Sequence, residues 1–409
     1  MKLVLVAGAR PNFMKIASIV DAIDMHNSKV RTVRHRFEYL VVHTGQHYDE
    51  KMSGTFFREL QLPRPAVDLE VGSSSHAVQT AEIMKRFEPV LEKEQPDAVV
   101  VVGDVNSTIA CALVASKTTY PTEPHASKKI RPLIVHVEAG LRSRDWSMPE
   151  EINRVLTDAM ADVLFVTEED AIRNLRREGI ARRKIHFVGN TMVDTLLRHA
   201  ARAEQSPILQ LLGLERPRRV GPTTINPYGV VTLHRPSNVD DPHVFRGILD
   251  ALLRISQTLP LVFPIHPRSF ARIKEFGLTS RIKMLGPEHG RDIEAGLHCI
   301  EPLGYLDFLR LMSKARIVLT DSGGIQEETT VLGVPCVTMR ENTERPVTMS
   351  QGTNVLAGTA KEAVVRQTLR QLKRTVKSMR PDFWDGKAGE RIVSIIFKTV
   401  AKGTHTRVG

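Results

Sequence analysis

The sequence predicts an α/β protein with two doubly wound, Rossmann-like domains that face each other across a cleft. Short apolar runs with strand character alternate with stretches of helical spacing, a pattern typical of parallel sheets with right-handed crossovers. This alternation occurs twice along the chain. A length of 409 residues also exceeds what one ordinary core accommodates, so two domains are the default expectation.

The first domain is expected to cover residues 1–189. Helical spacing occurs at 77–92 and 150–162, between apolar runs short enough to be buried strands. The predicted strands are 3–6, 39–42, 98–102, 133–137, 163–166 and 185–188. The segment 117–131 is polar, and we expect a loop there.

The second domain is expected to cover residues 190–387, beginning with a linking helix near 193–201. The proline-containing and arginine-rich segment 204–228 predicts an irregular connection. A final amphipathic stretch, 388–409, is expected to cross back and complete the first domain. The predicted strands of the second domain are 229–233, 261–265, 282–285, 317–320 and 336–339.

The charge of the chain favours an anionic small molecule as partner over nucleic acid. The formal net charge is +11, but aromatic residues make up only 5%, and no zinc, RNP-like or helix-turn-helix pattern accompanies the charge. The basic residues are scattered in small groups. We therefore expect a solvated basic surface and one anion-binding site.

The cysteines and the apolar runs predict a soluble, cytoplasmic protein. Cys111, Cys299 and Cys336 are few and far apart, which argues against a disulfide framework or a zinc site. The apolar run 3–7 is too short for a signal peptide, and no run approaches the roughly 18–20 residues that span a bilayer. We expect no membrane association.

Charged residues of both signs follow the predicted strands of the first domain. The segment from His136 to Arg154 contains Glu138 and Glu150, and Asp104 follows the strand 98–102. Because ligands of open α/β sheets bind at the carboxyl ends of strands, this crowding predicts a pocket that handles protons and an anion. The alternative is a solvated loop with salt bridges.

The first strand adds two cations to this predicted pocket. Gly8 permits a tight turn after the strand, Pro11 suits a helix start, and Arg10 and Lys15 lie beside them. A basic residue at a strand–turn–helix junction is common and is weak evidence alone. The acids that follow the neighbouring strands are the reason to include these cations in the predicted pocket.

The second domain contains a predicted phosphate cradle. A strand leads into Ser322, Gly323 and Gly324, where a helix begins, so backbone N–H groups and a hydroxyl could bind an anion. The lysine and spacing of a Walker loop and of a GxGxxG fingerprint are absent. The alternative is a helix that Asp321 or Ser322 merely caps.

Further residues of the second domain complete this predicted nucleotide site. Glu328 lies one turn into the helix and could accept hydrogen bonds from ribose hydroxyls, and Arg345 could contact phosphate. His234 and Arg235 follow another strand. No metal site is predicted, because His136, His234 and His266 lie on separate strands without ligand spacing.

At these residues the chain resembles the non-hydrolysing UDP-N-acetylglucosamine 2-epimerases, which share the two-domain architecture of GT-B glycosyltransferases. The resemblance extends from Gly8 to about Gly358. The motifs that carry it are His136-Val-Glu-Ala-Gly-Leu-Arg142, Pro149-Glu-Glu-Ile-Asn-Arg154, Val188-Gly-Asn-Thr191, Val231-Thr-Leu-His-Arg235, Asp321-Ser-Gly-Gly-Ile-Gln-Glu-Glu328 and Thr343-Glu-Arg-Pro346.

The resemblance implies a cofactor-free inversion at C2 of UDP-N-acetylglucosamine (UDP-GlcNAc), giving UDP-N-acetylmannosamine, for surface polysaccharide synthesis by a homodimer. The family eliminates UDP to form 2-acetamidoglucal and then adds UDP back. The resemblance assigns catalytic roles to Asp104, Glu138, Glu150 and His234. It assigns binding of the substrate and its UDP to Arg10, Lys15, Arg154, Ser322, Gly323, Gly324, Glu328 and Arg345. To these we add Arg235 as a binding residue, because it follows the same strand as His234.

Departures from the family pattern leave further functions open. The commoner His-Arg-Arg-Glu-Asn reads His234-Arg-Pro-Ser-Asn238 here, and the commoner Gly-Thr-Arg-Pro-Glu reads Gly8-Ala-Arg-Pro-Asn12. A modified UDP-N-acetyl sugar, such as a diacetamido uronic acid, is therefore a second candidate substrate. Gln46-His47 matches part of the family's activator site, but Tyr48-Asp49 departs from it. A UDP-sugar glycosyltransferase, a hydrolysing epimerase and a nucleotide-sugar sensor are three more functions that a nucleotide-sugar site of this kind could serve.

Overall fold

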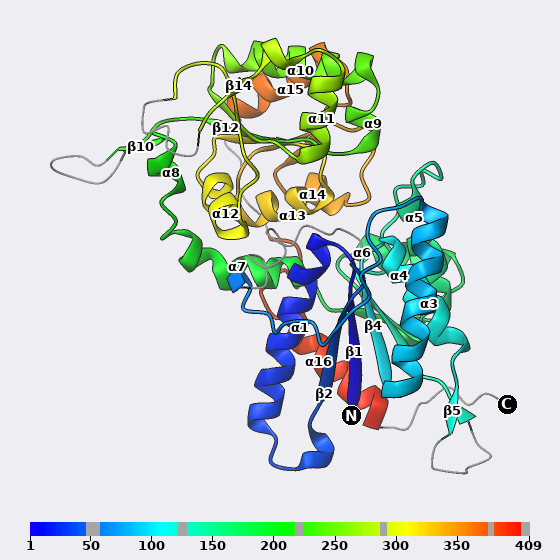
Figure 1. The fold of residues 1–409 in the computed structure, drawn as a ribbon. Coiled ribbons are helices and arrows are strands. Elements are labelled where there is room, and N and C mark those ends of the chain that lie inside the picture. The colour runs from blue at the N-terminus through cyan, green and yellow to red at the C-terminus, as the bar shows by residue number, and fades with distance from the viewer. Residues whose placement is uncertain (46–57, 122–128, 217–223, 287–292, 375–379, 402–409) are drawn as a thin grey trace. The chain divides into compact units, whose positions relative to one another are not determined.

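The chain forms two compact units, each built on its own parallel sheet. The computed structural model describes residues 1–45, 58–121, 129–216, 224–286, 293–374 and 380–401. One unit comprises Met1–Thr195 and Asp382–Gly409, and the other comprises Leu196–Pro381. Each has a seven-stranded sheet with helices packed on it (Figure 1), which confirms the predicted α/β class with two doubly wound sheets.

The strands of the first unit have the order β3-β2-β1-β4-β7-β8-β9 and pair in parallel. The chain builds this sheet outward from β1 in one direction and then, from β4, in the other, so the strand order reverses between β1 and β4. The strands are β1 (Lys2–Ala7), β2 (Glu38–His43), β3 (Val67–Asp68), β4 (Ala98–Val102), β7 (Leu133–Val137), β8 (Val163–Val166) and β9 (Ile185–Phe187).

Helices of the first unit cover this sheet. Helix α1 packs beside α16, and α4 packs between α3 and α5. Figure 1 shows the α1–α16 and α3–α4 pairs side by side. The 3₁₀ helices are η1 (Val33–His35) and η2 (Arg182–Lys184). The α-helices are α1 (Arg10–Lys29), α3 (His76–Glu94), α4 (Asn106–Lys117), α5 (Pro149–Met160), α6 (Glu169–Arg177) and α16 (Ala388–Ala401). Helix α7 (Thr191–Ala203) begins in the first unit and continues into the second.

The second unit repeats the arrangement with the strand order β14-β15-β13-β12-β16-β17-β18, which reverses between β12 and β16. Its strands are β12 (Gly229–Thr232), β13 (Leu261–Pro264), β14 (Lys283–Met284), β15 (Leu297–Ile300), β16 (Ile317–Thr320), β17 (Cys336–Thr338) and β18 (Asn354–Leu356). Its helices are α8 (Ile208–Leu211), α9 (Pro236–Val239), α10 (Pro242–Ser256), α11 (Pro267–Glu275), η3 (Thr279–Arg281), α12 (Tyr305–Ser313), α13 (Gly323–Leu332), α14 (Val347–Ser350) and α15 (Lys361–Leu372).

Two segments contain strands where the sequence predicted irregular chain. The expected loop 117–131 includes an antiparallel pair, β5 (Tyr120–Pro121) with β6 (Lys129–Ile130). The expected irregular connection 204–228 contains α8 and another antiparallel pair, β10 (Glu215–Arg216) with β11 (Thr224–Ile225). Each of these strands has only two residues, so periodicity could not reveal it.

The segment that follows the second unit returns to the first. Trp384 is 1% exposed, and its Nε1 donates to the carbonyl of Thr167 over 2.9 Å. A Cβ on Gly389 would lie 2.4 Å from the carbonyl oxygen of Ser18. This glycine therefore lets the start of α16 approach the backbone of α1.

Within the described ranges, no helix combines the length and the apolar character needed to cross a bilayer.

We expect Trp384→Ala to lower the free energy of unfolding of the first unit by about 3–5 kcal/mol, because it leaves a large cavity beneath the C-terminal segment. Phe383→Ala is the control, since this neighbouring ring is 44% exposed and should cost much less. Urea denaturation monitored by circular dichroism measures both. Equal losses for the two variants would contradict this account of how the C-terminal segment is anchored.

Candidate active site

The predicted site residues lie at the carboxyl ends of strands, at the two places where strand order reverses. In the first unit, Asp104 follows β4, next to β1, and Glu138 follows the neighbouring β7. In the second unit, His234 follows β12 and Asp321 follows its neighbour β16. Such switch points are where open α/β sheets bind ligands, because the chain segments diverge there.

Glu138 and Lys15 form a buried ion pair in the first unit. Lys15 Nζ lies 2.8 Å from Glu138 Oε1, and the residues are 5% and 4% exposed. Glu138 has a φ of 70°, and its N–H donates to the carbonyl of Phe165 over 3.0 Å. A side chain in this left-handed region is uncommon and strained, so the fold holds the carboxylate in a specific orientation.

The turn after β1 is organised by Asn12, a residue that stood out in the sequence only as a departure from the family pattern. Its Oδ1 accepts from the N–H groups of Gly8 and Ala9 at 3.1 and 2.8 Å. Its Nδ2 donates to the carbonyl of Val102 at 3.0 Å, so one amide joins the ends of β1 and β4. Arg10 is the first residue of α1, and its side chain lies outside the described part of the structure.

Asp104 and Arg154 form a second ion pair at the same sheet edge. Arg154 Nη2 lies 2.6 Å from Asp104 Oδ2, and Arg154 is 2% exposed. Glu151, which was not predicted as a site residue, contacts Arg154 at 3.1 Å and accepts from the N–H groups of Ser143 and Arg144 at 2.9 and 2.8 Å. Glu151 thereby fixes both the arginine and the loop before α5.

Glu150 is not a member of these ion pairs. It is half-buried in the first turn of α5, and its carboxylate forms no hydrogen bond or ion pair with any residue in the described ranges. The structure thus brings Lys15 to Glu138 and Arg154 to Asp104, but it links Glu150 to none of them. The alternative of a solvated loop is wrong for Glu138, Arg142 and Arg154, which are at most 8% exposed.

Asp321 organises the site of the second unit. It is fully buried, and its carboxylate accepts from the backbone N–H groups of His234 and Arg235 at 3.0 and 2.9 Å. His234 Nδ1 lies 3.0 Å from its other oxygen. Burial alone would raise the pKa of Asp321, but the His234 ring and these N–H donors outweigh it and lower the pKa. The imidazole of His234, whose side chain is 42% exposed, is thereby oriented.

The N-terminus of α13 has no side-chain cap. Ser322 is its N-cap, but no side-chain oxygen caps the helix, and Asp321 bonds to the chain after β12 instead. The alternative in which Asp321 or Ser322 caps this helix is therefore wrong. The side-chain ends of Arg345 and Glu344 lie so close to Gly323 that a Cβ at this position would displace them, and Gly324 follows it.

Arg345, a predicted phosphate partner, is held among carboxylates. Its Nε lies 2.8 Å from Glu327 Oε1, and its Nη1 bonds to Glu344. Glu344 also forms an ion pair with Arg340 at 2.9 Å and accepts a hydrogen bond from Arg235 at 3.4 Å. Three guanidinium groups therefore gather beside the start of α13, a place where the helix dipole favours negative charge.

Glu328 is a buried acid in the second turn of α13. Burial, followed by the nearby charge of Glu327, raises its pKa to about 8. Tyr305 lies close enough that burial and the charge of Glu328 raise the pKa of its phenol well above the ordinary value. A ligand hydroxyl that donates a hydrogen bond to this buried carboxyl would stabilise it.

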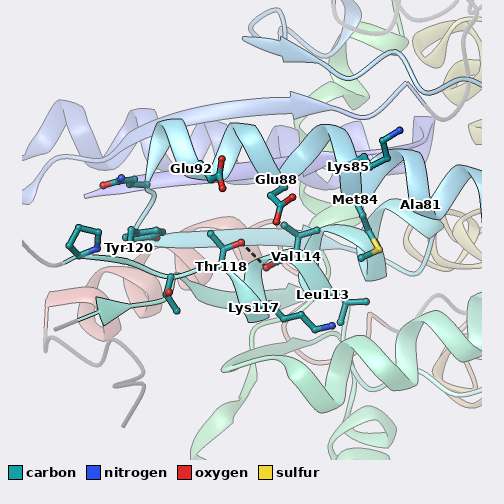
Figure 2. Close-up of a pocket in the computed structure, with 13 residues that line it drawn as sticks. Ala81, Met84, Lys85, Glu88, Glu92, Leu113, Val114, Lys117, Thr118 and Tyr120 are labelled. Atoms are coloured by element: carbon teal, nitrogen blue, oxygen red, sulfur yellow. Dashed lines mark hydrogen bonds between the residues drawn. The ribbon is translucent and has the colours of Figure 1, made fainter. Parts of the chain in front are cut away.

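A separate cavity of about 680 Å³ lies between α3, α4 and β5 (Figure 2). Lys85, Glu88, Glu92 and Lys117 line it, and Thr118 beside it donates to the carbonyl of Val114 over 2.9 Å. The cavity contains none of the predicted site residues. Its lining includes the last turns of α3 and α4, toward the amino ends of the strands, so it is distinct from the candidate active site.

Among the described side chains, no group of three or more histidine, cysteine, aspartate or glutamate residues is arranged so that it could hold a metal ion.

Known proteins with similar sequences match most of this chain. The family model "UDP-N-acetylglucosamine 2-epimerase" matches residues 31–397. A UDP-N-acetylglucosamine 2-epimerase of Methanocaldococcus jannaschii is 40% identical over 400 residues, which cover 97% of this chain and 99% of the relative. A UDP-2,3-diacetamido-2,3-dideoxy-D-glucuronate 2-epimerase of Pseudomonas aeruginosa is 37% identical over 401 residues, covering 97% and 100%.

Solved structures show the same likeness. The M. jannaschii UDP-GlcNAc 2-epimerase in complex with UDP-GlcNAc and UDP has a TM-score of 0.83 at 40% identity, with coverage of 97% of this chain and 100% of that one. The Neisseria meningitidis enzyme bound to UDP-GlcNAc has a TM-score of 0.77 at 26% identity, with the same coverage.

We expect the free energy of unfolding to fall as pH rises between about 4.5 and 8, because folded Glu328 retains a proton that the unfolded chain releases. Glu328→Gln removes this dependence. It should stabilise the ligand-free protein relative to wild type by an amount that grows to a few kcal/mol by about pH 8. Denaturant titrations at several pH values measure the difference. A Gln variant whose stability parallels wild type at every pH would contradict the assignment.

Proposed function

The chain belongs to the UDP-N-acetylglucosamine 2-epimerase family, and from this premise we propose that it interconverts UDP-GlcNAc and UDP-N-acetylmannosamine by inversion at C2. The single observation that supports this most is the presence of two ion pairs at one sheet edge: Lys15–Glu138, which is buried, and Arg154–Asp104, in which the arginine is buried but the Asp104 side chain is 23% exposed. Two carboxylates that differ in burial and partner suit a reaction that removes a proton and returns one.

The proposed reaction proceeds by anti elimination and re-addition. A carboxylate of the first unit removes the C2 proton while the bond from C1 to the pyrophosphate oxygen breaks, which gives 2-acetamidoglucal and UDP. The same oxygen then adds back to C1 as an acid delivers a proton to the opposite face of C2. Asp104, Glu138 and Glu150 are the candidates for these proton transfers, with Lys15, Arg10 and Arg154 as the neighbouring cations. The sequence of steps is redox-neutral and needs no cofactor.

In this proposal the second unit binds the UDP part of the substrate. The uncapped N-terminus of α13 at Ser322, Gly323 and Gly324 suits the pyrophosphate, and the geometry of His234 and Arg345 suits stabilisation of the charge that grows on departing UDP. Arg235 adds a further cation. The Glu328 carboxyl would accept from the ribose hydroxyls, so binding of UDP should release a proton below about pH 8.

A second substrate is a candidate because the P. aeruginosa relative is named for UDP-2,3-diacetamido-2,3-dideoxy-D-glucuronate. The replacement of the commoner Arg-Glu by Pro236-Ser237 after Arg235 is the sequence feature that favours this alternative. Either product would supply an N-acetylated mannose-type sugar for surface polysaccharide. We further propose a homodimer in the cytoplasm as the working form.

The decisive experiment is NMR of the purified protein with each of the two UDP-sugars in D₂O, without added metal or nicotinamide. We expect deuterium at C2 together with the 2-epimer of one of them, because re-addition takes its proton from solvent. The preferred sugar identifies the substrate. Release of free sugar would indicate hydrolysis, and neither exchange nor product with either sugar would refute the proposal.

We expect Glu138→Gln to reduce kcat by at least about 10³-fold while the affinity for UDP changes little, because the amide keeps the shape but cannot transfer the proton. Glu169→Gln is the control, since it removes an exposed carboxylate that pairs with Arg173 on the same unit and does not touch Lys15. Steady-state kinetics and calorimetric titration with UDP separate the two effects. A loss of UDP affinity as large as the loss of kcat would contradict the proposal that the first unit transfers protons and the second binds UDP.

A further inference from the structure

His136 is a fully buried polar residue that the proposed reaction does not use. It lies on the central strand β7, between Val101 of β4 and Leu164 of β8, and it is 0% exposed. A polar ring in such a position is costly unless both of its nitrogens have hydrogen-bond partners. The identity of these partners determines which protons the ring carries.

Both nitrogens of His136 face acceptors. Nε2 lies 2.8 Å from the carbonyl oxygen of Gly103, which can only accept, so Nε2 must donate. Nδ1 lies 2.7 Å from Oδ1 of Asp158 on α5. A neutral imidazole would satisfy this second contact only if Asp158 were protonated there.

The surroundings of Asp158 oppose its protonation. Its other oxygen lies 2.7 Å from Nη2 of Arg142 and accepts from the N–H of Gly140 at 3.0 Å. A guanidinium and a backbone donor both favour the ionised carboxylate. With Asp158 ionised, Nδ1 donates as well, and the ring carries both protons.

The hydrogen bonds of His136 join the backbones that carry the two acids. Gly103, whose carbonyl the ring holds, immediately precedes Asp104 and has a φ of 68°. Glu138 lies two residues after His136, directly after the end of β7. Through Asp158 the ring is also coupled to the N–H of Gly140, the next turn of the loop that begins at Glu138.

We propose that His136 is a positioning residue, held as an imidazolium, that fixes the loop of Asp104 relative to the loop of Glu138. The inference rests on the proposed function, which gives these acids the proton transfers. The ring acts on the reaction through the residues that it holds and contacts no substrate itself.

The first test is direct and independent of activity. Nitrogen-15 NMR of ligand-free protein with labelled histidine, assigned by comparison with His136→Gln, should show two protonated ring nitrogens for His136 at the pH of the assay. A neutral ring with one protonated nitrogen would overturn the proposal. Because no substrate is present, this result stands whether or not the protein proves to be an epimerase.

The second test separates positioning from folding. In His136→Gln the amide can bond to Gly103 or Asp158 but cannot carry the charge, and we expect kcat to fall about 10²-fold with little change in KM. Asp158→Asn, which should leave the ring neutral, should lose kcat to a similar extent. His186→Gln is the control, because this half-buried histidine of β9 lies outside the hydrogen-bond network.

The outcomes distinguish the two proposals. A folded His136→Gln or Asp158→Asn variant with wild-type kcat would overturn the positioning role. A loss of kcat that merely follows the fraction of unfolded protein, measured by thermal denaturation, would also overturn it. If the wild-type protein shows no exchange at C2, the proposed function fails while the state of the ring is still decided by NMR.

Discussion

Parallel strand pairing is the constraint on which the arrangement of candidate site residues in each unit depends. Because the paired strands of each sheet run the same way, their carboxyl ends open onto one edge. Reversal of strand order, at β1 and β4 and again at β12 and β16, separates the following segments there. Residues that are far apart in the sequence then lie close together, because each of them directly follows a strand that ends at this edge. Lys15 and Glu138 are 123 positions apart and yet form one buried pair. Asn12, after β1, donates to the carbonyl of Val102 at the end of β4, and Asp321, after β16, accepts from the N–H of Arg235 in the segment after β12. Each side chain thereby ties two neighbouring junctions together.

The fold sets the chemistry of its acids by what surrounds each one. Asp321 and Glu328 lie within two turns of each other and are both buried, but their pKa values shift in opposite directions. Asp321 faces an imidazole and backbone N–H donors, which favour its charge. Glu328 is buried and lies next to the charge of Glu327, and both disfavour the ionised form of its carboxyl. One carboxylate is therefore a fixed anchor, while the other can exchange a proton as its surroundings change.

The sequence predicts the long elements well and the connections between distant residues poorly. Strands β4, β7, β8 and β16 coincide with their predicted limits, since strands buried on both faces are continuous apolar runs. Strand β15 was missed because His298 interrupts its run, and β18 because it has only three residues. The acids and cations after the strands were recognised by residue type. Periodicity does not specify strand order or helix rotation. The pairing of these residues, the roles of Glu151 and Asp158, and the fact that Glu150 joins neither ion pair all depend on these two properties.

The return of the chain to the first unit affects the order in which the protein can be completed during synthesis. The second unit is one continuous stretch, Leu196–Pro381, whereas the first needs α16, which follows it. On the ribosome, the sheet of the first unit emerges earlier, but the face of α1 that receives α16 stays uncovered until translation has passed the whole of the second unit. The unit that begins first is thus finished last, and that exposed face of α1 is where a growing chain of this design most needs protection from aggregation.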